Sequence, residues 1–252
     1  MQYRPLGNTG IEVPLIGLGT VKLGRDQGVR YPRPFTIPDA RAAAALLKKA
    51  RELGVNLLDT APAYGTSEER LGALIGAERD HWIICTKVGE EFSNGVSRFD
   101  FSPEHTRRSV ERSLERLRTD RLDIVLIHSS GADVEILENL GTLDALRELQ
   151  ASGRVRAIGI SHKTPDGGRL ALAAGCDVIM TVLNPADREQ APIVAEAGRI
   201  GCGVLVKKAL ASGFAGPESL EWVAAQPGVS CIVTGTIDPE HLAANVAAVC
   251  PA

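Results

Sequence analysis

The chain has 252 residues, of which 44% are hydrophobic and 4% aromatic, with a formal net charge of −3 and a pI of about 6.0. This length suits one large domain or two small ones, and it can bury a core that needs no disulfides. The weakly acidic balance and the scarcity of aromatic side chains argue against nucleic-acid binding. No charged and then apolar leader opens the chain, and no apolar run approaches the ~20 residues of a membrane helix. We therefore expect a cytoplasmic protein without a membrane partner.

The five cysteines stand far apart, and none has CxxC spacing. Four of them fall in or beside apolar runs, which is typical of small buried hydrophobic residues in a reducing compartment. The pattern therefore predicts neither a metal site nor a disulfide framework.

Residues 1–14 open the chain with a predicted β-hairpin, whose turn is Gly7-Asn8-Thr9-Gly10. Short apolar runs then alternate with helix-like patterns. Strands are predicted over 15–18, 55–58, 82–86, 123–127, 155–160, 177–182, 203–206 and 230–233. Helices are predicted over 39–53, 67–76, 103–117, 134–151, 166–174, 187–198, 217–225 and 238–248.

Eight strands that alternate with eight helices predict an α/β fold, a (β/α)8 TIM barrel that occupies the whole chain, 1–252, as one domain. A doubly wound parallel sheet is the alternative. The usual nucleotide-binding fingerprints do not support that alternative. Gly17-Leu18-Gly19 lacks the third glycine of GxGxxG, and no GxxxxGK[ST] run occurs.

Two long loops follow the first and third predicted strands. The first, 19–38, contains Tyr31 and Phe35 as well as several cations, and the second, 89–102, contains Phe92. In a barrel both loops emerge at the C-terminal face, and loops of this length are usually functional or mobile. The three aromatic residues are predicted to line a pocket for a small substrate. Because cations lie nearby in the sequence, that substrate could be an anion. The alternative is that these side chains lie on the protein surface and bind no ligand.

Four polar side chains are predicted to meet at the same face. Asp59, Lys87 and His128 each end an apolar strand, and Tyr64 lies on the loop that follows Asp59. Taken singly, each has an ordinary structural explanation, such as a turn cap, a snorkelling lysine or a satisfied core histidine. Because the three strands are neighbours in a barrel, their ends converge, and this convergence predicts an active site.

These residues and several further motifs, in the same order, resemble the aldo-keto reductase family along essentially the whole chain. The matching stretches are Asp59-Thr-Ala, Tyr64-Gly, Ser67-Glu68, Thr86-Lys87, His128, Gly159-Ile160-Ser161, Leu210-Ala-Ser212-Gly213, Gly235-Thr236, Pro239-Glu240-His241-Leu242 and Asn245. The resemblance implies reduction of aldehydes or ketones to alcohols by hydride transfer from a reduced nicotinamide dinucleotide.

The resemblance also implies a catalytic role for each of the four polar residues. Tyr64 would donate a proton to the substrate carbonyl. A phenol has a pKa of about 10, and the ammonium of Lys87 beside it should lower that pKa. Asp59 would keep Lys87 charged and oriented, and His128 would hydrogen-bond the carbonyl oxygen or relay the proton.

A dinucleotide site built from strand ends and loops follows from the same resemblance. Its residues are Gly19, Thr20, Ser161, His162, Met180, Lys207, Lys208, Leu210, Ser212, Gly235, Thr236, His241 and Asn245. At the nicotinamide carboxamide, His162 replaces the usual asparagine and Met180 the usual glutamine. Lys207 replaces the tyrosine that many members stack on the nicotinamide ring. Lys207 should disfavour a positively charged oxidised nicotinamide, and Lys207 or Lys208 could contact the pyrophosphate.

The adenine end of this site lacks the Lys or Arg that usually binds the 2′-phosphate of NADPH. The matching stretch, 235–241, contains no fixed cation, and Asp238 is negative. Thr236, the start of the last helix and a protonated His241 remain as phosphate contacts. The resemblance favours NADPH, and the missing cation leaves NAD as the alternative. Because the chain ends at Ala252, we expect no long C-terminal substrate loop and a more open pocket.

Two other functions stay open from the sequence. The altered residues at 162, 180 and 207 are compatible with a nicotinamide-nucleotide sensor or partner subunit of low turnover on the same fold. Lys87 or Lys207 at a strand end is compatible with a Schiff-base lyase or aldolase. The intact catalytic set favours the reductase, acting on a small-molecule carbonyl substrate. The sequence does not predict an oligomeric state.

Overall fold

The computed structural model describes residues 1–29 and 31–250. Its central feature is a closed barrel of parallel strands that follow one another around the ring in chain order, with β12 pairing back to β3. The barrel strands are β3 (Ile16–Gly19), β4 (Leu57–Asp59), β5 (Ile83–Val88), β8 (Leu122–His128), β9 (Val155–Ser161), β10 (Val178–Val182), β11 (Gly203–Lys207) and β12 (Cys231–Gly235). This arrangement confirms the predicted barrel.

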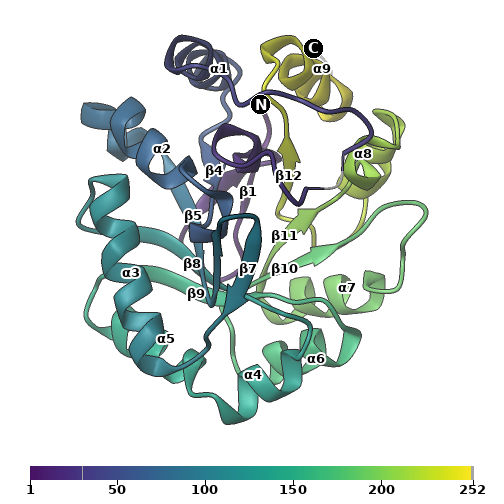
Figure 1. The fold of residues 1–252 in the computed structure, drawn as a ribbon. Helices are drawn as coiled ribbons and strands as arrows, with labels where there is room; N and C mark the ends of the chain where they lie inside the picture. Colours follow the sequence, from purple (N-terminus) through teal and green to yellow (C-terminus); the bar gives the residue numbers. More distant parts are fainter. Residues whose placement is uncertain (30, 251–252) are drawn as a thin grey trace.

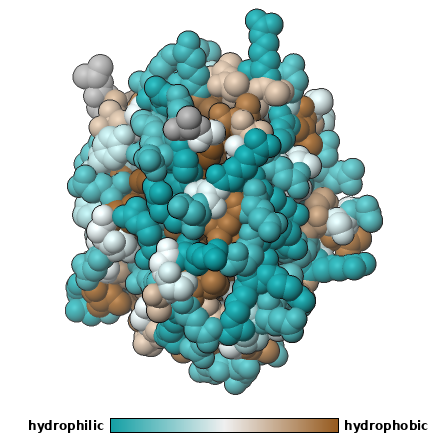
Figure 2. All heavy atoms as spheres, turned by 90° about the vertical axis from the view of Figure 1, so that its left-hand side faces the viewer, coloured by the Kyte–Doolittle hydropathy of each residue, from teal (hydrophilic) through white to brown (hydrophobic). Residues whose placement is uncertain are grey.

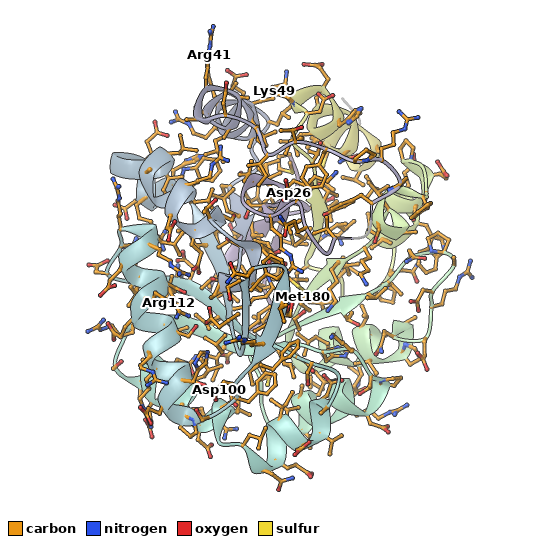
Figure 3. All side chains as sticks on the ribbon, in the orientation of Figure 1. Asp26, Arg41, Lys49, Asp100, Arg112 and Met180 are labelled. Atoms are coloured by element: carbon orange, nitrogen blue, oxygen red, sulfur yellow. The ribbon has the colours of Figure 1, made fainter. Side chains whose placement is uncertain are left out.

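α-Helices surround the barrel on its outside (Figure 1). Those in the described residues are α1 (Ala40–Glu52), α2 (Ser67–Ile75), α3 (Pro103–Leu117), α4 (Asp133–Asn139), α5 (Thr142–Ala151), α6 (Pro165–Ala173), α7 (Ala191–Ile200), α8 (Glu218–Ala224) and α9 (Pro239–Val249). In α1, Ala43, Leu46 and Ala50 are buried, whereas Arg41 points away from the barrel (Figure 3). Apolar residues at this spacing share one helix face, which explains the packing of α1 against the strands.

The barrel strands bury two separate apolar cores. Side chains that point outward pack against the helices, and those that point inward fill the barrel. Leu57, Ile124 and Leu205 belong to the inner core, together with Cys85 and Cys231. Both cysteine side chains are therefore packing residues of the barrel interior.

The N-terminal hairpin lies at the N-terminal ends of the barrel strands, where the Asn8 N–H donates to the Gly201 carbonyl oxygen just before β11. β1 (Tyr3–Pro5) and β2 (Glu12–Pro14) pair in the antiparallel sense, as predicted. Leu6, Ile11 and Val13 are buried within the inner core. The hairpin is thus part of the barrel's own packing.

Two helices differ from the sequence prediction. The single helix predicted over 134–151 is two helices, α4 and α5, because Gly141 between them has a left-handed backbone with a φ of 72°. The helix predicted over 187–198 begins later, at Ala191, because Asn184 and Asp187 pair in a turn before it. In both places a local turn interrupts a helix where the helical spacing of apolar residues continues in the sequence.

The segment after β5, which the sequence predicted as a loop over 89–102, contains a β-hairpin. β6 (Glu90–Ser93) and β7 (Val96–Phe99) pair in the antiparallel sense. Asn94 and Gly95 in the turn are both left-handed, as a type I′ turn requires. This hairpin and the segments 20–29 and 31–39 lie across the same face of the barrel (Figure 1). They cover the mouth, the face at which the C-terminal ends of the barrel strands meet.

The outer face that α2 and α3 present is mostly hydrophilic, with small and separate hydrophobic areas (Figure 2). Arg112 on α3 (Figure 3) is half-buried, and its guanidinium pairs with the carboxylate of Glu91 on β6. Among residues 1–29 and 31–250, no helix combines the length and the apolar character needed to cross a membrane.

Candidate active site

A buried ion pair lies at the mouth of the barrel. Asp59 ends β4 and Lys87 lies near the end of the neighbouring β5. Lys87 Nζ donates to Asp59 Oδ1 at 2.6 Å and to the Thr60 carbonyl oxygen at 2.8 Å. Burial by itself would lower the pKa of Lys87, but Asp59 and Tyr64 raise that pKa above its usual value. Lys87 is therefore an ammonium with a fixed position.

Tyr64 joins this pair from η2 (Pro62–Tyr64), a short 3₁₀ helix after β4. Its hydroxyl donates to Asp59 Oδ2 at 3.5 Å, and Lys87 Nζ lies 4.7 Å from the centre of its ring. His128, at the end of β8, meets the tyrosine ring edge-on with the ring centres 6.1 Å apart. The structure thus brings together all four side chains that the sequence predicted to converge.

Opposing influences set the pKa of Tyr64. Burial is the largest influence and raises it, the Asp59 carboxylate raises it further, and the Lys87 charge lowers it by less. Lys87 thus lowers the pKa of Tyr64, as expected, but burial and Asp59 outweigh it, and the net pKa lies above the usual value. The phenol therefore keeps its proton, which is the form that a proton donor needs.

Buried hydroxyl groups fix the loop that carries Tyr64. The Thr20 hydroxyl donates to the Asp59 carbonyl oxygen at 2.9 Å and lies 2.8 Å from Ser67 Oγ. Thr60 donates to the same Ser67 oxygen at 3.0 Å. Thr20, a predicted cofactor contact, thus uses its hydroxyl to join the end of β4 to the start of α2.

Glu90 is a member of this group that was not predicted from the sequence. Glu90 Oε2 lies 2.9 Å from His128 Nδ1, and Ser97 donates to Glu90 Oε1 at 2.6 Å. His128 Nδ1 has no well-aligned hydrogen bond among the described residues, so its short distance to the carboxylate defines this contact. Burial raises the pKa of Glu90, but His128, Ser97 and Arg25 together lower it to about 2. The Asn94-Gly95 turn was the signal that would have placed Glu90 in a hairpin.

Replacing Glu90 by glutamine should lower the pKa of His128 further. Burial already holds that pKa below its usual value, and Glu90 is a group that raises it. NMR titration of the imidazole signals of the wild-type protein and the variant measures the change. Ser97→Ala is the control, because it keeps the carboxylate and should shift the pKa much less. Equal His128 pKa values in Glu90→Gln and wild type would contradict this electrostatic role.

A second lysine lies on the other side of the mouth. Lys207 ends β11, and its side chain passes the end of β10 to reach β9. Its Nζ donates to Ser161 Oγ at 2.7 Å and to the His162 carbonyl oxygen at 3.2 Å. Burial, followed by the charges of neighbouring lysines, lowers the pKa of Lys207 to about 7. The structure therefore places Lys207 and Ser161 together, as the predicted dinucleotide site requires.

The two other residues predicted at the nicotinamide carboxamide lie differently. The His162 ring packs towards α6 and α7, where its Cε1 would lie 2.8 Å from a Cβ on Gly168 and Ile193 lies beside it. Burial and the Lys207 charge lower the pKa of His162 to about 4. Met180 belongs to the inner core and lies near the centre of the barrel (Figure 3). His162 thus presents its backbone carbonyl, not its ring, to Lys207.

The connection after β11 has an unusual backbone. Lys208, Ala211 and Ser212 are left-handed, with φ values of 57°, 47° and 62°. This conformation costs a residue with a Cβ about 1–2 kcal/mol, and such strain is often kept at functional sites. Leu210 packs against the outer core, and the Lys208 side chain is exposed. The strain thus lies in the loop that was predicted to hold the dinucleotide.

The start of α9 carries a negative cap. The Asp238 carboxylate accepts from the Glu240 N–H at 2.8 Å, and the Asp238 N–H donates to the Thr236 hydroxyl at 3.0 Å. His241 is exposed, with Nε2 3.7 Å from Asp238 Oδ2, and Asn245 is half-buried further along the helix. A carboxylate at this helix end is unfavourable for a phosphate ligand.

The predicted pocket aromatics lie over the mouth. Tyr31 and Phe35 meet edge-on with ring centres 5.6 Å apart, and Tyr31 Oη would lie 3.5 Å from a Cβ on Gly235. Phe92 comes from β6, and the Arg25 guanidinium lies 3.5 Å above its ring. Two walls of the mouth are thus aromatic and carry cations.

The rim between β3 and β12 suits an extended ligand. Gly19 and Gly235 are partners in the sheet, so no side chain projects there. A Cβ on Gly235 would approach Tyr31 Oη and the Gly19 carbonyl oxygen. The exposed Lys208 and the strained loop lie on the same half of the barrel. Within the described ranges, no group of His, Cys, Asp and Glu side chains is arranged to hold a metal ion. These features fit a dinucleotide, whose charged phosphates Lys208 and backbone N–H groups would hold.

Known proteins resemble this chain in sequence and in fold. The family model described as "Aldo/keto reductase family" matches residues 15–219. The crystal structure of a putative aldo-keto reductase from Pseudomonas aeruginosa matches with a TM-score of 0.91 and 54% identity, covering 98% of this chain and 93% of that one.

Curated relatives are less similar. L-Galactose dehydrogenase of Arabidopsis thaliana is 38% identical over 168 residues, 64% of this chain and 48% of that protein. NADH-specific methylglyoxal reductase of Escherichia coli is 32% identical over 202 residues, 75% of this chain and 60% of that protein. The chain spans about half the length of several curated relatives that it matches. A family model over most of the chain and a structural match over almost all of it lead to one conclusion: this chain belongs to the aldo/keto reductase family.

Proposed function

We propose that this protein reduces aldehyde or ketone carbonyls to alcohols with a reduced nicotinamide dinucleotide. The proposal rests on one observation above all, the meeting of Tyr64, the Lys87–Asp59 pair and His128 at the mouth of the barrel. A relative named as a dehydrogenase and one named as a reductase support it. Both names describe the same hydride transfer between an alcohol or carbonyl compound and the cofactor, in opposite directions. The comparisons favour neither the sensor nor the lyase alternative.

Tyr64 is the proposed proton donor. When bound, the dinucleotide supplies hydride to the carbonyl carbon. Tyr64 gives its phenolic proton to the carbonyl oxygen, and the nearby Lys87 ammonium stabilises the phenolate that remains. Asp59 holds that ammonium in place. His128 hydrogen-bonds the substrate oxygen while that oxygen carries negative charge. The high pKa of the free phenol keeps Tyr64 protonated until the substrate oxygen needs the proton.

The family generally uses NAD(P)H, and we propose that this member prefers NADH. The Asp238 carboxylate at the start of α9 would repel the 2′-phosphate of NADPH. His241 is exposed and beside that carboxylate, so it is a weak substitute for an arginine clamp. The relative in Escherichia coli carries NADH specificity in its name. NADPH, which the family resemblance favours, is the alternative.

A binding and turnover experiment tests the proposal. The protein is titrated with NADH and, separately, with NADPH while nicotinamide fluorescence is recorded. 4-Nitrobenzaldehyde or methylglyoxal is then added, and the absorbance of the reduced cofactor is followed. We expect both nucleotides to bind, NADH more tightly, and the absorbance to fall when the carbonyl compound is present. Binding without turnover would indicate the sensor. Failure of both nucleotides to bind, with borohydride trapping of a carbonyl compound on lysine, would indicate the lyase.

A further inference from the structure

Lys207 is a cation without a nearby counterion. Its ammonium donates only to neutral oxygens, Ser161 Oγ and the His162 carbonyl, in the part of the chain that the structure describes. No carboxylate among those residues lies within 4.0 Å of it, whereas Lys87 on the other side of the mouth has Asp59 at 2.6 Å. The positive charge of Lys207 is therefore uncompensated where it lies.

Other charged groups make this cation less stable still. Lys208 on the same loop, Lys87 on β5 and Lys163 after β9 all disfavour its charged form, and Asp59 favours it. Burial is the largest cause, and the pKa of Lys207 falls to about 7. A second cation brought into this side of the mouth would add to a repulsion that is already present.

The hydride donor has to come close to Lys207. The Lys207 charge contributes to lowering the pKa of His128, so its field reaches the carbonyl-binding side of the mouth. A carbonyl held by Tyr64 and His128 accepts hydride at its carbon, and the nicotinamide ring must lie against that carbon. A ring bound for this transfer would therefore face both the catalytic group on β4, β5 and β8 and the lysine on β11.

We propose, building on the function proposed above, that Lys207 makes the site distinguish the oxidation state of its cofactor. The reduced nicotinamide ring is neutral, and the oxidised ring carries one positive charge. Repulsion between that charge and the Lys207 ammonium weakens binding of the oxidised form and leaves binding of the reduced form intact. Lys207 is thus a specificity-determining residue that favours release of the oxidised cofactor after hydride transfer.

Dissociation constants test this inference without measuring catalysis. Isothermal titration with NADH, NAD⁺, NADPH and NADP⁺ gives the ratio of oxidised to reduced affinity for each pair. At pH 6, we expect the reduced form to bind the wild-type protein on the order of 100-fold more tightly, because repulsion between two unit charges on one side of the mouth reaches that level in a protein site. Lys207→Met should lower the ratio at least about tenfold. Lys208→Met is the matched control, because an exposed lysine near the phosphates should weaken both forms equally and keep the ratio.

A pH series adds a second readout. In the wild-type protein the ratio should fall as the pH rises through about 7, because Lys207 then loses its charge. Lys207→Arg keeps the charge and should hold the ratio constant up to pH 9. An unchanged ratio in Lys207→Met would overturn the inference, and so would a wild-type ratio near one at pH 6. Absence of binding by all four nucleotides would instead contradict the proposed function.

Discussion

Tyr64→Phe should lower the rate of carbonyl reduction roughly 10²–10⁴-fold, the usual size of a lost general acid. The substitution removes the only atom that the proposed mechanism asks to donate a proton. The ring and its contact with His128 remain, and the hydroxyl makes only a long contact of 3.5 Å with Asp59. The dissociation constant of the reduced cofactor should therefore change by less than about threefold, because the loss occurs in the transition state and not in binding.

Single-turnover kinetics with excess protein over reduced cofactor measures this loss directly. Cofactor binding is measured separately by fluorescence. Tyr3→Phe is the matched control, because Tyr3 is a half-exposed phenol in the N-terminal hairpin, whose hydroxyl donates to the Gly54 carbonyl oxygen. A Tyr64→Phe protein that reduces 4-nitrobenzaldehyde at the wild-type rate would remove Tyr64 from the mechanism.

Lys87→Met should both abolish carbonyl reduction and lower the free energy of unfolding by about 3–5 kcal/mol. Lys87 is 1% exposed, and its removal leaves the Asp59 carboxylate in the barrel mouth without the ammonium that neutralises it. The Thr60 carbonyl oxygen loses its donor as well. The cost of an unpaired buried charge is what makes this effect large.

A double variant separates stability from chemistry. In Lys87→Met/Asp59→Leu both charges are gone, so chemical denaturation should show that most of the lost stability returns. Carbonyl reduction should remain absent, because the phenolate of Tyr64 would have no cation beside it. A single Lys87→Met variant as stable as the wild type would show that the ion pair contributes little to the fold. Activity in the double variant would exclude Lys87 from the mechanism.

The barrel could be predicted from the sequence because its signals are local and repeated. Each strand is a short apolar run followed by a helical period, and the structure has strands at all the predicted positions with small shifts at their ends. The split at Gly141 was not predicted, because one left-handed residue hardly disturbs the apolar period on either side. The hairpin over 90–99 was not predicted as strands, because its side chains are mostly polar or half-buried and lack a clear alternation.

The catalytic group could be predicted because strand ends point to one face of a barrel. Asp59, Lys87 and His128 each follow an apolar run, so their direction is set by the strand itself. The direction of the His162 side chain follows the same rule, which predicts that its ring points away from the nicotinamide carboxamide. Ser161 points towards the mouth, so the next residue points away from it, towards α6 and α7.

The Asn94-Gly95 turn indicates the hairpin that carries Glu90, but the sequence could not reveal that Glu90 lies beside His128. Its place beside His128 depends on the hairpin folding back over the mouth, and on Ser97 in the second hairpin strand holding the carboxylate. That contact joins residues 38 positions apart on elements that have no common periodicity. The left-handed backbone at Lys208, Ala211 and Ser212 could not be predicted from the sequence either, because none of these residue types usually adopts that conformation.

Transfer of deuterium tests the proposed chemistry most directly. The protein is given NADH carrying deuterium at the transferable position of C4, together with 4-nitrobenzaldehyde, and the benzylic carbon of the product is examined by NMR. Direct hydride transfer predicts 4-nitrobenzyl alcohol with one deuterium on that carbon. Alcohol without deuterium, or no alcohol from a protein that binds the cofactor, would contradict a carbonyl reductase that works from this site.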